Sequence, residues 1–192
     1  LLSGVGPKKH LESLGIDIVN DLPGVGQNLQ EHPDIPVVYD SLKKDGVSLS
    51  AIFARTLEGI KYLCGRRGPL KNSITTVGGW LKSDDDIEVP DFQIHFLPLK
   101  FADHGRNIQF LLDHGFSAHL NLARPRSRGS VTLLSDDPLQ PPLIQLNLLK
   151  EQEDLDDMVK AIKKMREIIA MPAFDGHRGK EVFPGKDVQT DE

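Results

Sequence analysis

The sequence predicts an α+β domain in which a mixed, largely antiparallel sheet is covered by helices on one face. Two observations favour this fold class. Several short segments have β-like composition, and two longer segments repeat apolar residues with the period of an amphipathic helix. The strands and helices do not alternate regularly, as they would in a parallel α/β fold. A length of 192 residues suits a single hydrophobic core.

The first part of the chain predicts two helices and two strands. Residues 8–14 follow Pro7 and end at Gly15, which is typical of a short helix. Residues 16–19 and 35–39 have strand-like composition. Residues 50–66 carry apolar side chains at helical spacing, and glycines follow them.

The middle of the chain predicts strands rather than helices. We expect strands at residues 75–81, 91–97 and 116–122, followed by β-like runs at 130–134 and 143–148. The order of the runs at 116–122 and 130–134 suggests that they form an antiparallel pair.

The last strong element is a helix from about residue 154 to residue 170, which Pro172 ends. Its apolar residues recur at helical spacing and predict one buried face. These residues are Leu155, Met158, Val159, Ile162, Met165 and Ile169.

Composition excludes several classes of function. A net charge of −5 argues against a nucleic-acid partner, and no apolar run is long enough to cross a bilayer. The single cysteine excludes an internal disulfide and favours a cytoplasmic location.

The obvious catalytic and metal motifs are missing. Residues 4–6 and 24–26 each read Gly-Val-Gly, but neither continues to the third glycine of a dinucleotide-binding turn. The histidines lack the spacing of a zinc site, and no Gly-x-Ser-x-Gly elbow is present. We therefore assign no catalytic residue and no metal ligand.

Three segments nevertheless carry a family resemblance. Residues 1–7, the run Leu-Pro-Gly-Val-Gly-Gln-Asn-Leu-Gln-Glu-His at 22–32 and the run Arg-Pro-Arg-Ser-Arg-Gly-Ser-Val at 124–131 resemble the glucose-methanol-choline (GMC) flavoprotein oxidoreductases, nearest to the choline dehydrogenase and alcohol dehydrogenase group. The run Pro-Leu-Ile to Asn at 142–147 and the helix after it fall in the family's order.

This resemblance implies an FAD enzyme that oxidises an alcohol to an aldehyde by hydride transfer to the flavin. The family's Gly-x-Gly-x-x-Gly turn and catalytic histidine match nothing here, so the chain resembles an internal fragment that we expect to be inactive alone and not to retain FAD. The resemblance implies a remnant of the FAD-binding part and a flavin-facing loop at 1–34, the substrate-binding domain at 35–175 and a loose end at 176–192. The remaining N- and C-terminal parts of the enzyme would be its partners.

The resemblance also implies the site residues. In the flavin-facing loop these are Asn28, Leu29 and His32. In the substrate-binding domain they are Gln93, His95, Phe96, His119 and Asn121. Alternation along residues 91–96 places Gln93 and His95 on one face of the strand and the apolar residues on the other.

Two alternatives remain open. Choline would need an aromatic cage for its ammonium group, and aromatic residues make up only 6% of the chain, so a general aliphatic primary alcohol is favoured over choline. A non-catalytic binding module derived from the same family is the second alternative.

Overall fold

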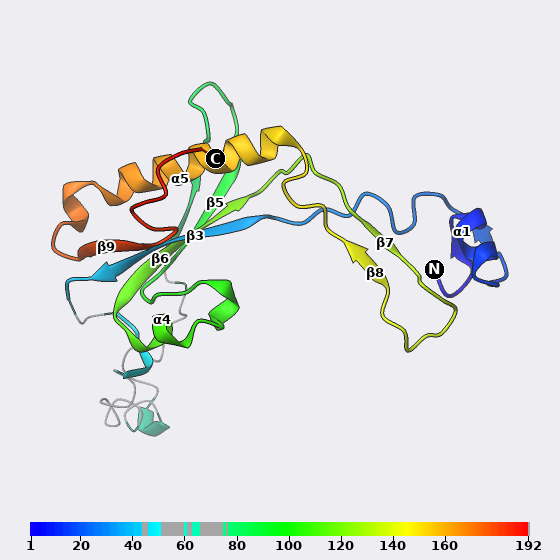
Figure 1. The fold of residues 1–192 in the computed structure, drawn as a ribbon, viewed down its shortest axis with the longest axis horizontal. Helices are drawn as coiled ribbons and strands as arrows, with labels where there is room; N and C mark the ends of the chain where they lie inside the picture. The colour runs from blue at the N-terminus through cyan, green and yellow to red at the C-terminus, as the bar shows by residue number, and fades with distance from the viewer. Residues whose placement is uncertain (44–45, 51–59, 61–62, 66–74, 76, 192) are drawn as a thin grey trace. The chain divides into compact units, whose positions relative to one another are not determined.

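The computed structural model describes residues 1–43, 46–50, 60, 63–65, 75 and 77–191. The chain divides into two compact units. The first unit consists of Leu1–Pro33 and Arg124–Leu155, and the second of Asp34–Ala123 and Asp156–Glu192. Figure 1 shows the elements of both units in their order along the chain.

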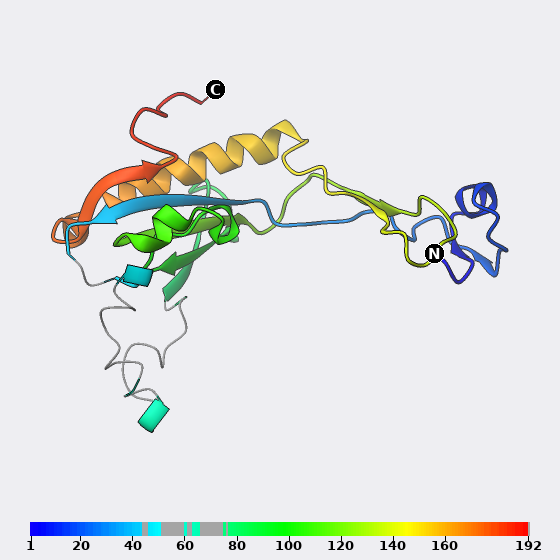
Figure 2. The ribbon, with the colours of Figure 1, turned by 60° about the horizontal axis from the view of Figure 1, so that its bottom comes forward.

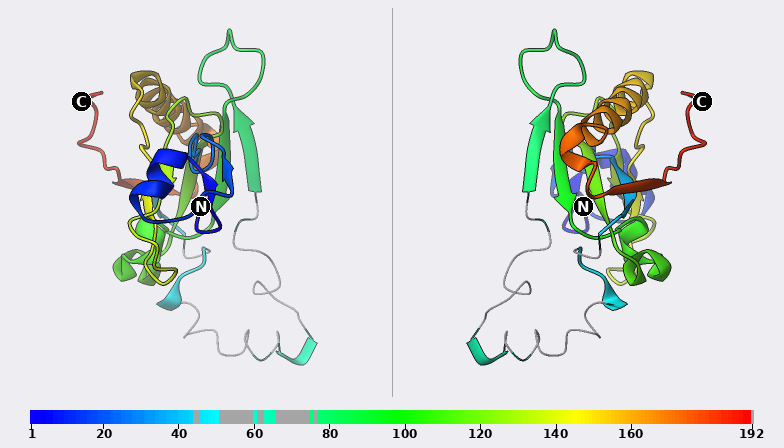
Figure 3. Two further views of the ribbon diagram at one scale, coloured as in Figure 1. Left: turned by 90° about the vertical axis from the view of Figure 1, so that its right-hand side faces the viewer. Right: turned by 90° about the vertical axis from the view of Figure 1, so that its left-hand side faces the viewer.

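The second unit contains one five-stranded sheet. Its strands are β3 (Asp34–Ser41), β4 (Val77–Leu81), β5 (Phe92–Leu97), β6 (Gly115–Leu122) and β9 (Arg178–Phe183), in the order β4-β5-β6-β3-β9. Every neighbouring pair is antiparallel, which confirms the predicted sheet. Strands β4 and β9 lie at its two edges (Figure 3).

Helix α5 (Gln152–Ile169) lies along this sheet (Figures 1 and 2). Arg166 on the helix forms a bidentate ion pair with Glu181 on β9, and Glu181 also accepts a hydrogen bond of 2.9 Å from the Tyr39 hydroxyl on β3. This network holds the helix against the edge of the sheet. The 3-10 helix η3 (Pro172–Phe174) follows α5.

The buried face of α5 differs in part from the prediction. Residues Met158, Met165 and Ile169 are buried as expected, whereas Leu155 is 39% exposed. The buried position in the first turn belongs to Asp154, whose carboxylate binds backbone N–H groups that a leucine could not satisfy.

The opposite face of the sheet contacts the segment that joins β5 to β6. This segment contains the 3-10 helix η2 (Asp103–Gly105) and the short helix α4 (Ile108–Leu112). The Ser117 hydroxyl on β6 donates to the carbonyl of Leu99, and Ser117 is fully buried. The sheet therefore has contacts on both faces, with the long helix on one of them as predicted.

The first unit contains two small sheets. In the N-terminal one, β1 (Val5–Gly6) pairs in parallel with β2 (Asn20–Asp21), and α1 (Lys8–Ser13) joins them. The strand predicted at residues 16–19 is wrong, because the chain there is still closing the helix. The first backbone N–H of that segment donates to the carbonyl of Leu11.

The second small sheet pairs β7 (Ser130–Thr132) with β8 (Leu143–Gln145) in antiparallel register. The predicted pair of residues 116–122 with 130–134 is therefore wrong. Strand β6 lies between β3 and β5 and pairs with both. Neither of its edges is therefore left for residues 130–134. Strand β8 is also shorter than predicted, and the chain after it turns through Asn147 and Leu149, both with left-handed φ angles.

Two further expectations concern other segments of the second unit. The helix predicted at residues 50–66 lies largely outside the described residues. Residues 178–183, within the segment expected to be loose, form β9 and pair with β3. Among the described residues, no helix combines the length and the apolar character that crossing a membrane requires.

Candidate functional site

The candidate flavin-facing loop lies in the first unit and is fixed to β7. The Gly26 carbonyl accepts a hydrogen bond of 2.7 Å from Val131 N–H, and Leu29 and Gly129 exchange two backbone hydrogen bonds of 3.0 and 2.8 Å. Gly26 has a φ of +79°, and a Cβ there would clash with the Val131 carbonyl oxygen. Glycine is therefore required for the loop to follow the strand this closely.

Asn28 lies between these two anchors with a φ of +60°. This left-handed conformation is uncommon outside glycine, and asparagine tolerates it better than most residues. Neither the Asn28 amide nor its backbone N–H has a hydrogen-bond partner among the described residues. The residue is exposed and so presents unused donors.

The other two loop candidates differ in exposure. Leu29 is half-buried, whereas His32 is exposed and its backbone N–H donates to the carboxylate of Glu31. The loop thus offers an amide and an imidazole to a ligand. Such donors suit the carbonyl and nitrogen edge of a flavin ring.

Four of the five candidate substrate residues lie together on one face of the sheet in the second unit. In the register of β5 and β6, Gln93 is opposite Asn121 and His95 is opposite His119. Directly opposite residues of antiparallel strands project to the same face, and residues two apart on one strand share that face. The structure therefore brings these four side chains into one contiguous polar patch.

His119 is already engaged by the protein. Its Nδ1 lies 2.8 Å from Oδ2 of Asp34, and its Nε2 lies 3.2 Å from the carbonyl oxygen of Phe101. The residue is 8% exposed. His119 therefore holds neighbouring structure in place, and Gln93, His95 and Asn121 are the members of the patch whose side chains form no hydrogen bond with a described residue.

Two further residues lie on this face, and sequence reasoning did not place either of them there. Asp34 is opposite Asn121 on β3, and Trp80 is opposite Gln93 on β4. A row of four side chains, Trp80, Gln93, Asn121 and Asp34, thus crosses four strands. Trp80 is 57% exposed. The strands are far apart in the sequence, so only their pairing register reveals the row.

A buried cation anchors the segment that joins β5 to β6. The Lys100 ammonium, 4% exposed, lies 2.9 Å from a carboxylate oxygen of Asp40 and 2.9 Å from one of Asp113. Burial lowers the pKa of Lys100, but the hydrogen bonds from its ammonium to Asp113 and Asp40 outweigh burial and raise the pKa above its ordinary value. The charge is therefore retained and has a structural role.

Phe96 lies on the other face of the sheet. It is opposite Ala118 on β6, and Ala118 is adjacent in that strand to His119 of the polar patch. Adjacent residues of a strand project to opposite faces of the sheet. Its ring stacks on Phe116 with 5.3 Å between the ring centroids. The structure therefore separates Phe96 from the other four candidate substrate residues.

The basic run at 124–131 has contacts within the first unit. Arg128 Nη1 donates to the carbonyls of Pro125 and Ser127, and Arg126 lies 3.9 Å from the carboxylate of Asp154. These contacts fit a turn held by its own side chains.

Comparisons with known proteins find similarity to one family of enzymes. Residues 125–192 match the family model described as GMC oxidoreductase. The chain is 37% identical over 193 residues to the oxygen-dependent choline dehydrogenase of Brucella ovis, covering 100% of this chain and 35% of the relative. It is 39% identical to the protein of the same name from Chromohalobacter salexigens, covering 99% and 34%.

Solved structures show the same fold. A variant of formate oxidase from Aspergillus oryzae RIB40 matches with a TM-score of 0.81 at 23% identity, over 99% of this chain and 38% of that one. A fungal aryl-alcohol oxidase matches with a TM-score of 0.76 at 19% identity, over 100% and 39%. The chain spans about a third of the length of the curated relatives it matches.

Proposed function

Because this chain belongs to the GMC oxidoreductase family, we propose that it forms the substrate-binding part of an FAD-dependent enzyme that oxidises a small alcohol to an aldehyde. The observation that carries this proposal is the contiguous polar patch on one face of the sheet. Unengaged amide and imidazole groups on a rigid sheet can orient a hydroxyl group by hydrogen bonds. We assign residues 35–175 to substrate binding and residues 1–34 to the flavin-facing part.

Asn28, Leu29 and His32 are the residues that would hold the flavin. Bound FAD supplies the hydride acceptor of the reaction. The donors of Asn28 are preset by the anchored, left-handed loop, so they need little reordering to meet a ligand. Leu29 would pack against the ring, and His32 would add a further polar contact.

Gln93, His95 and Asn121 are the residues that would bind the alcohol. Each of these residues is half-buried, and its side chain has no hydrogen-bond partner among the described residues. His119 acts indirectly, since Asp34 and the Phe101 carbonyl hold its ring beside His95. We therefore treat His119 as a positioning residue of this face.

Within the alcohol class we favour a choline-like substrate, which reverses the preference for an uncharged aliphatic alcohol that composition alone gave. The relatives at 37% and 39% identity are named choline dehydrogenases. The exposed Trp80 ring shares the face with the polar patch, and an aromatic ring attracts a quaternary ammonium group. The carboxylate of Asp34 lies on the same face and adds a negative charge.

We further propose that the partners of this chain are the flavin-binding and catalytic-histidine segments of the same enzyme, and that the enzyme works in the cytoplasm. A non-catalytic binding module from the same family is the alternative. The two readings differ in one observable property, which is whether an alcohol reduces bound flavin.

The test uses the product of the complete reading frame that encodes this chain, loaded with FAD. Under anaerobic conditions, choline or butan-1-ol is added and the loss of flavin absorbance is followed. Gln93→Leu and Asn121→Leu should each lower kcat/KM about fivefold, as expected for one lost hydrogen bond. The exposed Gln145→Leu on β8 serves as the matched control.

Flavin reduction by choline faster than by butan-1-ol supports the choline-like substrate. Reduction by neither alcohol, in a protein that binds FAD, supports the binding module and overturns the enzyme reading. Variants of the polar patch that match the Gln145→Leu control would show that the substrate binds elsewhere.

A further inference from the structure

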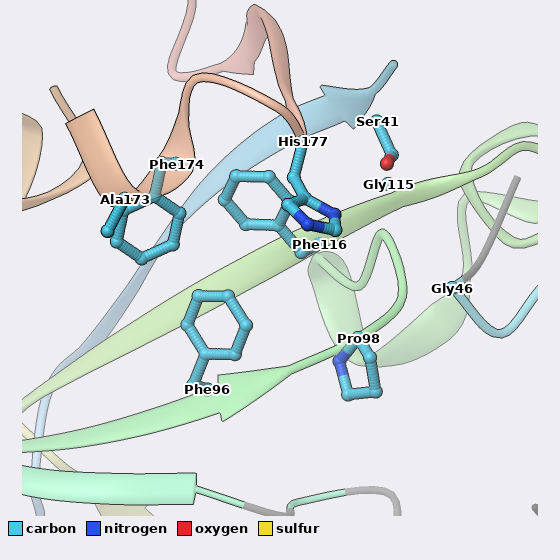
Figure 4. A pocket seen from close by; sticks show the side chains of 9 residues that line it. All are labelled: Ser41, Gly46, Phe96, Pro98, Gly115, Phe116, Ala173, Phe174 and His177. Carbon is cyan, nitrogen blue, oxygen red and sulfur yellow. The ribbon is translucent and has the colours of Figure 1, made fainter. Parts of the chain in front are cut away.

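A pocket of about 350 Å³ opens on the sheet face opposite the polar patch (Figure 4). Phe96, Phe116 and Phe174 provide aromatic rings, and Pro98 adds an apolar side. Ser41 and His177 are its polar side chains. This volume is at the lower end of the range of small-molecule pockets, so it suits a ligand with one ring.

The aromatic wall of the pocket is held in place by its own packing. Phe116 is 6% exposed and stacks between Phe96, at 5.3 Å, and Tyr39, at 5.6 Å between ring centroids. Phe174 is tilted against both Phe96 and Phe116, at 6.1 and 5.9 Å. Such rings accept another ring in offset or edge-on contact without first rearranging.

The polar rim carries an un-neutralised positive charge. Lys43 Nζ lies 3.5 Å from Nε2 of His177, and Lys43 has no carboxylate partner among the described residues. Two acidic side chains close to His177 in the sequence are already paired, Asp175 with Arg178 at 2.7 Å and Glu181 with Arg166. The rim is therefore complementary to an anion.

The rim is also anchored to the sheet. The backbone N–H of Ser41 donates to the carbonyl of His114, and that of Leu42 donates to the carbonyl of His177. The Lys43 N–H donates to the Ser41 hydroxyl at 3.2 Å. The cation and the aromatic wall thus belong to one connected structure.

We propose that this pocket binds a small aromatic carboxylate. Its ring would pack against Phe96, Phe116 and Phe174, and its carboxylate would lie at the rim beside His177 and Lys43. The pocket is on the sheet face opposite Gln93 and the rest of the polar patch, so this site does not depend on the proposed alcohol oxidation.

The test is a titration of the product of the complete reading frame that encodes this chain with 4-fluorophenylacetate, followed by fluorine NMR of the ligand. Its amide, 4-fluorophenylacetamide, has the same ring without the charge. Ala173→Leu fills the pocket from its lining, and Ala170→Leu makes the same change at an exposed position outside the lining. Lys43→Gln removes the charge and keeps a side chain of similar length.

We expect saturable one-to-one binding of the carboxylate, about twofold to fivefold tighter than the amide, as for an exposed ion pair. Ala173→Leu should abolish binding, Ala170→Leu should leave it unchanged, and Lys43→Gln should lower carboxylate affinity to that of the amide. The proposal is overturned by non-saturable binding, by unchanged binding in Ala173→Leu, or by a carboxylate preference that survives Lys43→Gln.

Discussion

Replacing Asp154 by alanine should destabilise the first unit strongly. The Asp154 side chain is fully buried and accepts three hydrogen bonds, from the backbone N–H groups of Arg126 and Ser127 at 2.8 Å and from the Ser127 hydroxyl at 2.6 Å. Two of these donors are backbone groups that cannot turn to another acceptor. Leaving buried donors unsatisfied costs about 1–3 kcal/mol each, so we expect a loss of about 3–5 kcal/mol.

Two measurements check this expectation. Urea unfolding followed by circular dichroism gives the change in the free energy of unfolding, and hydrogen exchange reports the Arg126 and Ser127 amides directly. The matched control is Glu153→Ala, an exposed carboxylate in the same helical turn, which should change stability by less than about 0.5 kcal/mol. Unchanged exchange of the two amides in Asp154→Ala would refute the reasoning.

The same carboxylate predicts a pH dependence. Burial raises the pKa of Asp154, but the hydrogen bonds from Arg126 and Ser127 outweigh burial and lower the pKa below its ordinary value. The unfolded chain therefore takes up the proton first as pH falls. The stability that Asp154 contributes is present above the ordinary carboxyl pKa and is lost as pH falls through the lowered one. Asp154→Ala should remove this part of the acid dependence.

Three further changes have expected outcomes. Burial, with the hydrogen bond to Glu181, raises the pKa of Tyr39 to about 12, so stability should fall as pH rises from about 10 to about 12, and Glu181→Gln should lower the tyrosine pKa in an ultraviolet titration. The same variant breaks the ion pair to Arg166, and a melting temperature equal to wild type would contradict that contribution. Leu149→Gly should stabilise the chain by up to about 1 kcal/mol in urea unfolding, because Leu149 has a φ of +54°. Gly129→Ala should lower the midpoint of the same transition, because its Cβ would clash with backbone carbonyls at the end of β8, and a wild-type midpoint would argue against the clash.

Local periodicity was sufficient to predict most elements of the sheet and the long helix. The runs around β5 and β6 are recognisable because the alternation of polar and apolar residues is a property of a single strand. The pairing of residues 116–122 with 130–134 was wrong because partner choice depends on long-range packing. The run at 130–134 lies in a different unit from β6.

The candidate site shows the same division between local and long-range information. Sequence spacing predicted that Gln93 and His95 share a face, and the register places Asn121 opposite Gln93 on it. It could not show that Asp34 and the Phe101 carbonyl engage His119, because those contacts join three separated segments.

The most direct test of the proposed substrate face is a crystal structure of the complete, FAD-loaded enzyme with a non-reacting analogue of choline. We predict that the analogue lies on the sheet face of the polar patch, with a polar atom within hydrogen-bond distance of Gln93, His95 or Asn121. An analogue bound elsewhere, with this face covered by other parts of the protein, would contradict the proposal.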